Sequence, residues 1–434
     1  MKKLLRVFSV VTLAWFAAAQ TSPAPPIRTE LRCGAVLDVR SGKLLSRQTI
    51  VVTGNKIVSI APTAASKDAA SIDLSGLTCL PGLIDMHTHL TDSDGAYDLA
   101  RPMKLTGAQM AFESIPNAKA TLMAGFTTVR DVGAFRAFVD VALRDAIDQG
   151  IVAGPRIVPA GAYVTISGGA GTLSGFAPDI ELPLELRYGV ADGPDQVRQR
   201  VREIIRHGAG VIKVLSTGAV LTMGSQPGAQ EFNEDEIRAA VEEATKAGLK
   251  VACHAHAPAG IKAAVRAGVA SIEHGSFVDE EALQMMKQHG TYLVPDMYDD
   301  AVIMADKSLP AEYHAKEKIA GDAQRWGVRR AIALGVKIAF GTDAAVIKHG
   351  DNGKQFDTYV KIGMTPLFAI QTATINAADL LGWPDRVGAL ETGKFADIIA
   401  VRGNPLENIR TLENVPFVMK DGTVYKNEAA SAPR

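Results

Sequence analysis

The stretch PGLIDMHTHL, residues 81–90, is a short apolar run that ends in two histidines one residue apart. In an extended strand, residues i and i+2 point to the same face, so His87 and His89 are expected side by side. Two imidazoles held in this way are suited to bind a divalent metal ion. The alternative interpretation is a chance pair of histidines without a ligand.

Two other stretches place histidines in the same way. ACHAHA, residues 252–257, contains His254 and His256, and SIEHGS, residues 271–276, contains His274. Each of these histidines comes at or just after the end of an apolar run. Three such runs in one chain make coincidence a poor explanation, and together they predict a metal centre.

One lysine is expected on an apolar strand face, where burying its charge would cost free energy. In GVIKVLSTG, residues 210–218, Lys213 shares a strand face with Val211 and Leu215. If that face lines a barrel, burial lowers the pKa of the amine. A neutral amine can add carbon dioxide and become a carbamate that bridges two metal ions. Spacing alone favours the simpler interpretation, a lysine paired with a neighbouring acid.

A carboxylate lies near the end of the last apolar run of this kind. Asp343 lies in IAFGTDAA, residues 338–345, at the end of a predicted strand. A carboxylate at such a position can bind metal and take a proton from water. An isolated Thr-Asp pair is more often the cap of a helix, and this alternative stays open.

These residues need a scaffold that gathers the ends of several strands. Short apolar runs alternate with helix-like stretches such as NEDEIRAAVEEATKAG, residues 233–248. This repetition predicts an α/β fold, a (β/α)8 barrel of the TIM type, whose active site lies at the carboxyl ends of the strands. A doubly wound sheet is the alternative, but no glycine fingerprint follows the first run. The predicted strands are residues 83–90, 125–133, 156–164, 210–218, 250–257, 271–277, 291–297 and 337–345.

The two ends of the chain have a different pattern. Residues 31–80 and 387–426 contain short alternating runs separated by Ser-Gly, Gly-Asn and Asp-Gly turns. We therefore predict a small β-sandwich domain built from residues 27–80 and 385–434, around a barrel domain of residues 81–384. The glycine-rich stretch ISGGAGTLSG, residues 166–175, lacks the ending of a phosphate loop and is expected as a loop at the barrel mouth.

Residues 1–26 are expected to be a signal peptide and leader. MKKLLR is basic, VFSVVTLAWF is apolar but short for a membrane span, and AAAQ offers a cleavage site after Ala19. The protein is therefore expected to be exported, either to the periplasm or out of the cell. A membrane anchor is the alternative interpretation.

Composition limits the function classes. The chain has 434 residues, 47% of them hydrophobic, and a formal net charge of -1, which is typical of a soluble globular enzyme. We expect a homo-oligomer that binds neither nucleic acid nor membrane. Cys33, Cys79 and Cys253 are scattered, so we expect no disulfide framework and a stability that depends on the core.

The chain resembles the amidohydrolase superfamily of metal-dependent hydrolases. The resemblance covers essentially the whole chain after the leader and extends to GALETGKFADIIAVRGNPLENI, residues 388–409. It is strongest to the Xaa-Pro dipeptidase-like branch, with imidazolonepropionase-like hydrolases and enzymes that hydrolyse ochratoxin-type amides as neighbours. The matching stretches, in the family's order, are PGLIDMHTH, TTVRDVG, VIKVLSTG, CHAHA, IEHG and GTDAA.

The resemblance implies two divalent metal ions, most simply zinc, with a hydroxide between them. The implied ligands are His87, His89 and Asp343 for one ion, His254 and His274 for the other, and N-carboxylated Lys213 as the bridge. Asp343 is also implied as the group that carries a proton to the leaving nitrogen. His256 is the alternative to His254 as ligand, and otherwise contacts the substrate or supports the ligands.

Substrate contacts are expected from the loops at the barrel mouth. Besides His256, the candidates are Tyr163, Arg187, Tyr188 and His349. Relatives often have a histidine in the glycine-rich loop, where this chain has Ala170. This departure puts substrate contacts from that loop in doubt.

The resemblance favours hydrolysis of the amide bond of a dipeptide or N-acyl amino acid, including amides of the ochratoxin type. One alternative is a ring-opening hydrolase of cyclic amides, like imidazolonepropionase. Deaminases of the superfamily usually have an acid where this chain has Ala257, which disfavours that class. A barrel that has lost its metals and acts as a scaffold is a further alternative, but the full set of ligand types argues against it.

Overall fold

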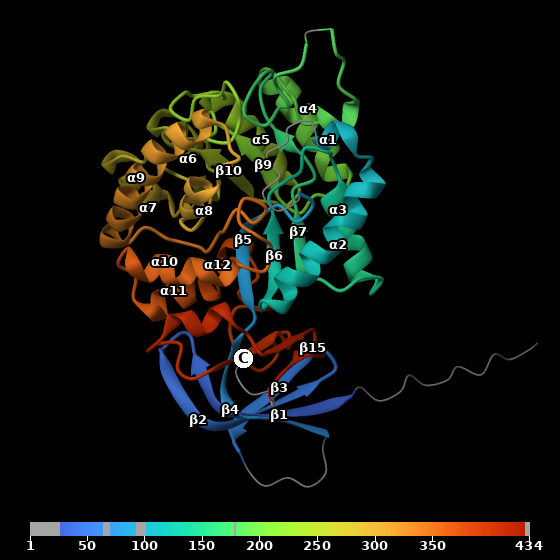
Figure 1. The fold of residues 1–434 in the computed structure, drawn as a ribbon, viewed down its shortest axis with the longest axis vertical. Helices are drawn as coiled ribbons and strands as arrows, with labels where there is room; N and C mark the ends of the chain where they lie inside the picture. Colours follow the sequence, from blue (N-terminus) through green and yellow to red (C-terminus); the bar gives the residue numbers. More distant parts are fainter. Residues whose placement is uncertain (1–26, 64–69, 93–100, 178, 430–434) are drawn as a thin grey trace, which may run out of the picture.

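The structure is a computed structural model that describes residues 27–63, 70–92, 101–177 and 179–429. It has a helix-rich part and, below it in Figure 1, a β-rich part in which strands from the early and the late parts of the sequence lie together. No helix in these ranges is long and apolar enough to cross a membrane. The predicted signal peptide and leader lie outside the described residues.

Parallel strands form the centre of the helix-rich part, in two sheets of order β5-β6-β7 and β12-β11-β10-β9-β8. Seven of the eight predicted barrel strands are present, and the third is split into β7 and β8. The strands are β5 (Leu83–Thr88), β6 (Phe126–Asp131), β7 (Arg156–Pro159), β8 (Tyr163–Val164), β9 (Ile212–Leu215), β10 (Val251–Ala255), β11 (Ser271–His274) and β12 (Tyr292–Val294).

The eighth predicted strand, residues 337–345, is not a regular strand but links the two sheets. Leu293 donates its N–H to the carbonyl of Lys337, and Met86 donates to Phe340, each at 2.8 Å. Gly341 is required in this segment, because a Cβ there would lie 2.4 Å from the side chain of Val294. At the other junction, Gly210 and Val211 donate to Pro159. These hydrogen bonds join the sheets into the (β/α)8 barrel.

Helices surround the strands (Figure 1). The predicted helix over residues 233–248 is confirmed as α5, and its start is fixed by reciprocal hydrogen bonds between Asn233 and Glu236. The helices are α1 (Arg101–Lys104), α2 (Gly107–Met123), α3 (Val139–Asp148), α4 (Pro194–Arg206), α5 (Glu234–Lys246), α6 (Pro258–Ala267), α7 (Glu280–His289), α8 (Asp299–Ala305), α9 (Ala311–Leu334), α10 (Gln355–Lys361), α11 (Pro366–Thr372) and α12 (Ile375–Leu381). Three short 3-10 helices cover Leu184–Leu186, Asn352–Lys354 and Ile409–Glu413.

The β-rich part is a seven-stranded sheet of order β15-β14-β13-β4-β1-β2-β3. β13 pairs antiparallel with β4, so the predicted pairing of the two chain ends is confirmed. Buried side chains from six of the strands meet in one hydrophobic core, as in a sandwich. The strands are β1 (Arg28–Asp38), β2 (Lys43–Thr53), β3 (Lys56–Pro62), β4 (Ala70–Pro81), β13 (Ile398–Arg402), β14 (Phe417–Lys420) and β15 (Thr423–Asn427).

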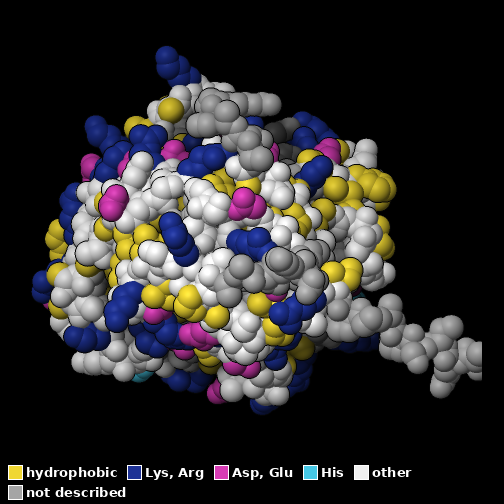
Figure 2. All heavy atoms as spheres, turned by 90° about the horizontal axis from the view of Figure 1, so that it is seen from below, with side chains coloured by type: hydrophobic (Ala, Val, Ile, Leu, Met, Phe, Trp, Pro, Cys, Tyr) yellow, Lys and Arg dark blue, Asp and Glu magenta, His cyan; other side chains and the backbone are white. Residues whose placement is uncertain are grey.

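The surface has mixed charge. On the face seen in Figure 2, lysine and arginine side chains lie among acidic and hydrophobic ones rather than in one basic field. This distribution agrees with the formal net charge of -1.

The prediction that the chain has no disulfide is wrong. Cys33 on β1 and Cys79 on β4 form one, with their Cα atoms 6.1 Å apart. The two strands are far apart in sequence but pair in parallel, which brings the two cysteines together. Spacing along the chain could not reveal this contact. Cys253 is free and buried.

We expect this disulfide to stabilise the β-rich part. It closes a loop with a sequence separation of 46, for which the chain-entropy model gives about 4 kcal/mol. The double variant Cys33→Ala, Cys79→Ala is expected to unfold at a clearly lower urea concentration than the wild type. Reductant should lower the wild-type midpoint and leave that of the double variant unchanged. Equal midpoints for all samples would contradict this expectation.

Candidate metal centre

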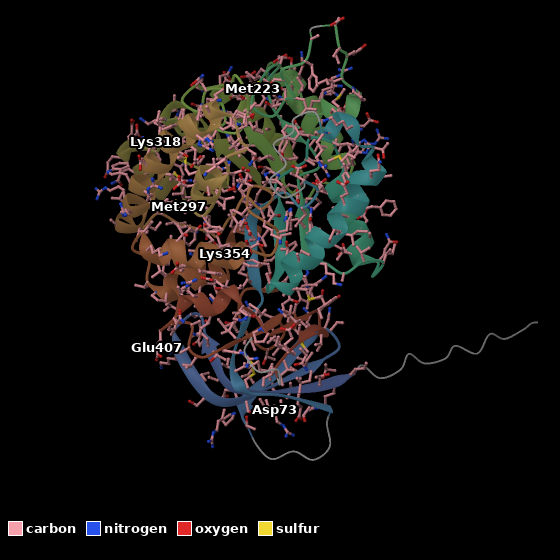
Figure 3. The ribbon with its side chains drawn as sticks, in the orientation of Figure 1. Asp73, Met223, Met297, Lys318, Lys354 and Glu407 are labelled. Atoms are coloured by element: carbon pink, nitrogen blue, oxygen red, sulfur yellow. A yellow bond between two sulfur atoms is a disulfide. The ribbon has the colours of Figure 1, made fainter. Side chains whose placement is uncertain are left out.

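The structure brings all six predicted metal ligands to one end of the barrel. Their side chains line a single cavity of about 190 Å³. Leu221 and Thr222 also line it, and the next residue, Met223, lies at the end of the barrel away from the β-rich part (Figure 3). The cavity therefore lies at the carboxyl ends of the strands, where barrel enzymes have their active sites. The six residues are His87, His89, Lys213, His254, His274 and Asp343.

The first group of ligands combines two imidazoles and a carboxylate. One oxygen of Asp343 lies 3.4 Å from Nε2 of His87 and 3.1 Å from Nε2 of His89. Burial alone would raise the pKa of Asp343, but the two histidines outweigh it and lower that pKa. Burial would lower the pKa of His89, yet its hydrogen bond to Asp343 raises it to about 9. The carboxylate is therefore ionised and directed at both imidazoles.

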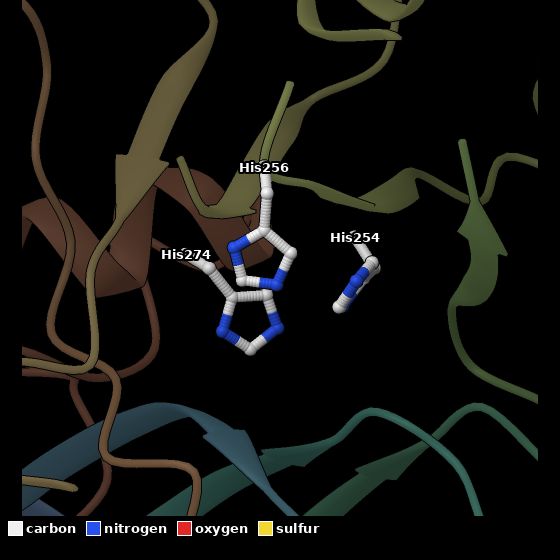
Figure 4. A group of neighbouring side chains, drawn as sticks. All are labelled: His254, His256 and His274. Carbon is white, nitrogen blue, oxygen red and sulfur yellow. The ribbon is translucent and has the colours of Figure 1, made fainter. Parts of the chain in front are cut away.

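The second group consists of three imidazoles. The rings of His256 and His274 stack with centroids 4.9 Å apart, and His254 lies beside them (Figure 4). The centroid of His254 is 4.5 Å from that of His274. Burial lowers the pKa of His254 and of His256 well below the usual value, which keeps both neutral and able to bind metal.

The two groups are close enough to share ligands. His274 and Asp343, with Asp296, also offer ligand atoms within 4.8 Å of one another. Imidazole nitrogens and carboxylate oxygens at these separations fit zinc-like divalent ions, so these side chains are suited to form a metal centre.

Lys213 lines the same cavity as a buried amine, and its charge acts on His87 of the first group and His254 of the second. Only 2% of its surface is exposed, and burial lowers its pKa. Among the residues that the structure describes, none forms a hydrogen bond or an ion pair with its amine, although Glu273 and Asp343 act on it through their charges. The paired lysine that spacing favoured is therefore not what the structure shows.

Hydrogen bonds behind the ligands fix which nitrogen faces the cavity. His87 donates from Nδ1 to Glu273 at 3.0 Å, and Glu273 in turn accepts from Arg130 at 2.7 Å. His274 donates from Nδ1 to Asp296 at 2.5 Å, and His89 from Nδ1 to the Gly133 carbonyl at 2.8 Å. In each case the bond at Nδ1 leaves Nε2 as the nitrogen available to a metal ion, which at His89 would take the place of the proton shared with Asp343.

Sequence reasoning missed these supporting groups. Glu273 and Arg130 are completely or almost completely buried within apolar strands, and a charge at such a position was the available signal. The backbone conformation also helps to orient two of the candidate ligands, because His274 and Asp343 have positive φ angles of 65° and 53°. Non-glycine residues in this conformation cost energy and cluster at functional sites.

We expect Glu273→Gln to weaken metal binding without unfolding the protein. Glutamine keeps the size of the side chain but loses the charge that pairs with Arg130 and orients His87. Loss of such a supporting group typically lowers metal affinity by about 10- to 100-fold. Competition with a chromophoric chelator measures this affinity. Glu243→Gln, which changes an ion-paired residue on the outer helices, is the matched control. Affinity within twofold of wild type would contradict the expectation.

The predicted substrate contacts divide into two sets. Tyr163 and His256 line the cavity. Arg187 and Tyr188 do not, because their segment packs on the outside of the barrel: Arg187 is exposed and bonded to the Leu182 carbonyl, and the Tyr188 ring packs on Phe138. The structure therefore does not bring these two residues to the site.

His349 also lies outside the lining of the cavity. It is buried behind it, with Nε2 3.1 Å from the carbonyl of Asp92, whose side chain does line the cavity. Ala170, in the glycine-rich loop, lines the cavity and donates its N–H to the carboxylate of Glu231. The Glu231 carboxylate thus holds the backbone of this loop at the barrel mouth, and sequence reasoning did not identify this contact.

Comparison with known proteins agrees with this geometry. A model of the amidohydrolase family matches residues 78–425. Ochratoxinase from Aspergillus niger is 33% identical over 374 residues, which cover 80% of this chain and 75% of that protein. Its crystal structure superposes with a TM-score of 0.82.

Two solved structures are similar over their whole length. A Xaa-Pro dipeptidase with methionine bound in its active site is 40% identical, with a TM-score of 0.87, and covers 92% of this chain and 100% of its own. A prolidase complexed with N-methylphosphonate-L-proline is 33% identical, with a TM-score of 0.85 and the same coverage. With its barrel and its cluster of candidate metal ligands, the chain belongs to the amidohydrolase family and is a hydrolase that acts on amide C–N bonds.

Proposed function

We propose that the chain is a binuclear metal-dependent amidohydrolase that cleaves the amide bond of a dipeptide or an N-acyl amino acid. The observation that carries this proposal is the pair of candidate ligand groups that meet at His274 and Asp343, with the buried Lys213 in the same cavity. N-carboxylation of Lys213 would give the site a carboxylate that reaches both groups. Zinc is the metal that best fits the imidazole-rich donor set.

The residues of the chain have distinct roles in this proposal. Two bound divalent ions would polarise the scissile carbonyl and acidify the attacking water. Asp343 accepts the proton of that water and delivers it to the leaving nitrogen, because its oxygens face the cavity and stay ionised. His256 lines the same cavity with Nδ1 2.8 Å from the Ser276 hydroxyl, and when that hydroxyl donates to Nδ1, the proton lies on Nε2, which can donate to the substrate carbonyl.

Tyr163 is the second substrate contact that we retain. Burial raises the pKa of its phenol well above 10, so the hydroxyl stays protonated. That hydroxyl lies 3.1 Å from Nδ1 of His89 and donates to the Gly133 carbonyl at 3.2 Å. Tyr163 thus positions a metal ligand and presents its ring to the substrate.

The size of the cavity and the relatives support a small linear amide. A space of about 190 Å³ suits a small molecule and not a folded polypeptide. The relatives named as dipeptidase, prolidase and ochratoxinase have names that refer to small amide substrates.

The test is a substrate panel on purified, metal-loaded protein. It contains dipeptides, N-acyl amino acids including an N-acyl phenylalanine of the ochratoxin type, a cyclic imide and an imidazolone. We expect turnover of linear amides only. Turnover restricted to the cyclic compounds would replace the proposal with ring opening, and no turnover of any compound with two metals bound would refute it.

Export is also part of the proposal. The Cys33–Cys79 disulfide supports it, because disulfides persist mainly in oxidising compartments. Mass spectrometry of the exported protein should find an N-terminus near Gln20. A protein found only in the cytoplasm with Met1 intact would contradict export.

A further inference from the structure

Two acidic side chains from the outer helices reach the wall of the catalytic cavity. Asp299 begins α8 and Glu317 lies in α9, and both line the cavity that contains the metal ligands. Their exposed fractions are 8% and 5%, so both carboxyl groups are largely removed from bulk water. Neither belongs to the ligand groups described above.

These two carboxyl groups have no cationic partner among the residues that the structure describes. Asp299 accepts the backbone N–H of Asp300 at 2.8 Å. Glu317 interacts with another carboxyl, that of Asp300. Arg325 acts on Glu317 through its charge, but it forms its ion pairs with Asp300 and Asp322 instead. Buried acids are normally paired, so this wall of the cavity has an uncompensated acidic character.

The electrostatics of the pair agree with that description. Burial raises the pKa of Glu317 to about 8, and the neighbouring acids Asp300 and Asp296 add to the shift. Burial raises the pKa of Asp299 as well, again with the help of neighbouring acids. A cation bound between the two groups would offset both the desolvation and the mutual repulsion.

The rest of this wall is apolar. Ile303 lies one turn after Asp299 on α8, and Leu221 and Val346 line the cavity and pack around the same small core as Ile303. An aliphatic chain that ends in a positive charge would match this surface, with its carbon atoms against the apolar residues and its head at the acids.

We propose that Asp299 and Glu317 form a subsite for a cationic group of the substrate, an ammonium or a guanidinium. This inference rests on the proposed function and narrows its substrate class from N-acyl amino acids and dipeptides in general to those with such a group. The group can come from two sources, the free α-amine of a dipeptide or the side chain of lysine or arginine.

The subsite should appear first as a binding preference of the metal-loaded protein. The probes are L-lysine, L-norleucine and hexanoate, which share a carbon chain and a carboxylate but carry two, one and no ammonium groups. A charge-assisted contact is expected to change the dissociation constant by about tenfold or more. Tighter binding of lysine than of norleucine identifies the side chain as the source, and tighter binding of norleucine than of hexanoate identifies the α-amine. Equal binding of all three overturns the inference.

Variants then assign the preference to the two residues. In Asp299→Asn and in Glu317→Gln, the cationic preference should fall by about tenfold or more, while hexanoate binds as in the wild type. Asp322→Asn is the matched control, since it removes a charge from the exposed side of the same helix, where its side chain is 71% exposed. A preference that survives in both variants would overturn the assignment.

Hydrolysis assays distinguish a failure of the proposed subsite from a failure of the proposed function. We expect kcat/KM for a dipeptide with a lysine side chain to exceed that of its norleucine counterpart, or kcat/KM for a dipeptide with a free α-amine to exceed that of its N-acetylated counterpart, by about tenfold or more. Equal hydrolysis of the charged and neutral members would overturn the subsite and leave the amidohydrolase proposal intact. If no linear amide is cleaved, the proposed function fails, and the binding measurements still decide whether the subsite exists.

Discussion

Asp343→Asn is expected to lower kcat by about 10²- to 10⁴-fold, the usual contribution of a general base. Asparagine still offers an oxygen to a metal ion near His87 and His89, but it cannot accept a proton. Most of the metal should therefore remain bound. The measurement combines kcat on the best linear amide with metal content by elemental analysis.

Asp92→Asn is the comparison variant, because Asp92 is another acid that lines the same cavity. It loses one negative charge near His89 but has no proposed role in proton transfer, so a much smaller loss of turnover is expected. If Asp343→Asn turned over substrate at a rate near that of wild type, the base would have to be another group, with His256 the first to examine.

Lys213→Ala is expected to lose at least one of two metal ions and to lower kcat/KM by about 10²- to 10³-fold or more, since Lewis-acid stabilisation of the reacting carbonyl is lost. Alanine removes the amine that would carry the bridging carboxylate. Metal content and steady-state kinetics of the same preparation measure both effects. Bicarbonate should speed the reactivation of wild-type apoprotein by zinc and have no effect on the variant.

Lys250→Ala is the matched control for this variant. Lys250 directly precedes β10, and its amine donates to the carbonyls of Asp379 and Leu380, outside the metal centre. We expect this control to keep both ions and most of its activity. Full activity and two ions in Lys213→Ala would show that the lysine does not bridge the metals.

The sequence was sufficient to predict the barrel and the gathering of the predicted ligand residues at one cavity, because both depend on local patterns. Strand alternation sets the face on which His87 and His89 lie, and the repetition of apolar runs sets the strand order. Residues 337–345 are less regular than predicted, since Gly341 fits tightly between β5 and β12 and the turn at Asp343 bends the backbone.

What the sequence could not provide were contacts between distant segments. Cys33 meets Cys79 because β1 pairs with β4, and Glu273 meets His87 because two strands converge at the barrel centre. The carboxyl groups of α8 and α9 enter the cavity only through the packing of those helices. Such contacts have no fixed spacing along the chain, so they are visible only in three dimensions.

The lack of a fixed spacing also explains why only some of the predicted substrate contacts line the cavity. Tyr163 lies in the third predicted strand, residues 156–164, and its position in the cavity was predictable from that strand. Arg187 and Tyr188 lie after a long loop, and nothing in its sequence shows that the chain turns to the outside of the barrel there.

Anomalous diffraction from crystals of the zinc-loaded protein tests most directly whether the metal centre is binuclear and bridged by a modified lysine. We predict two zinc peaks, one among His87, His89 and Asp343 and one beside His254 and His274, with electron density for a carbamate on the Lys213 amine between them. A single zinc peak next to an unmodified Lys213 would contradict the account.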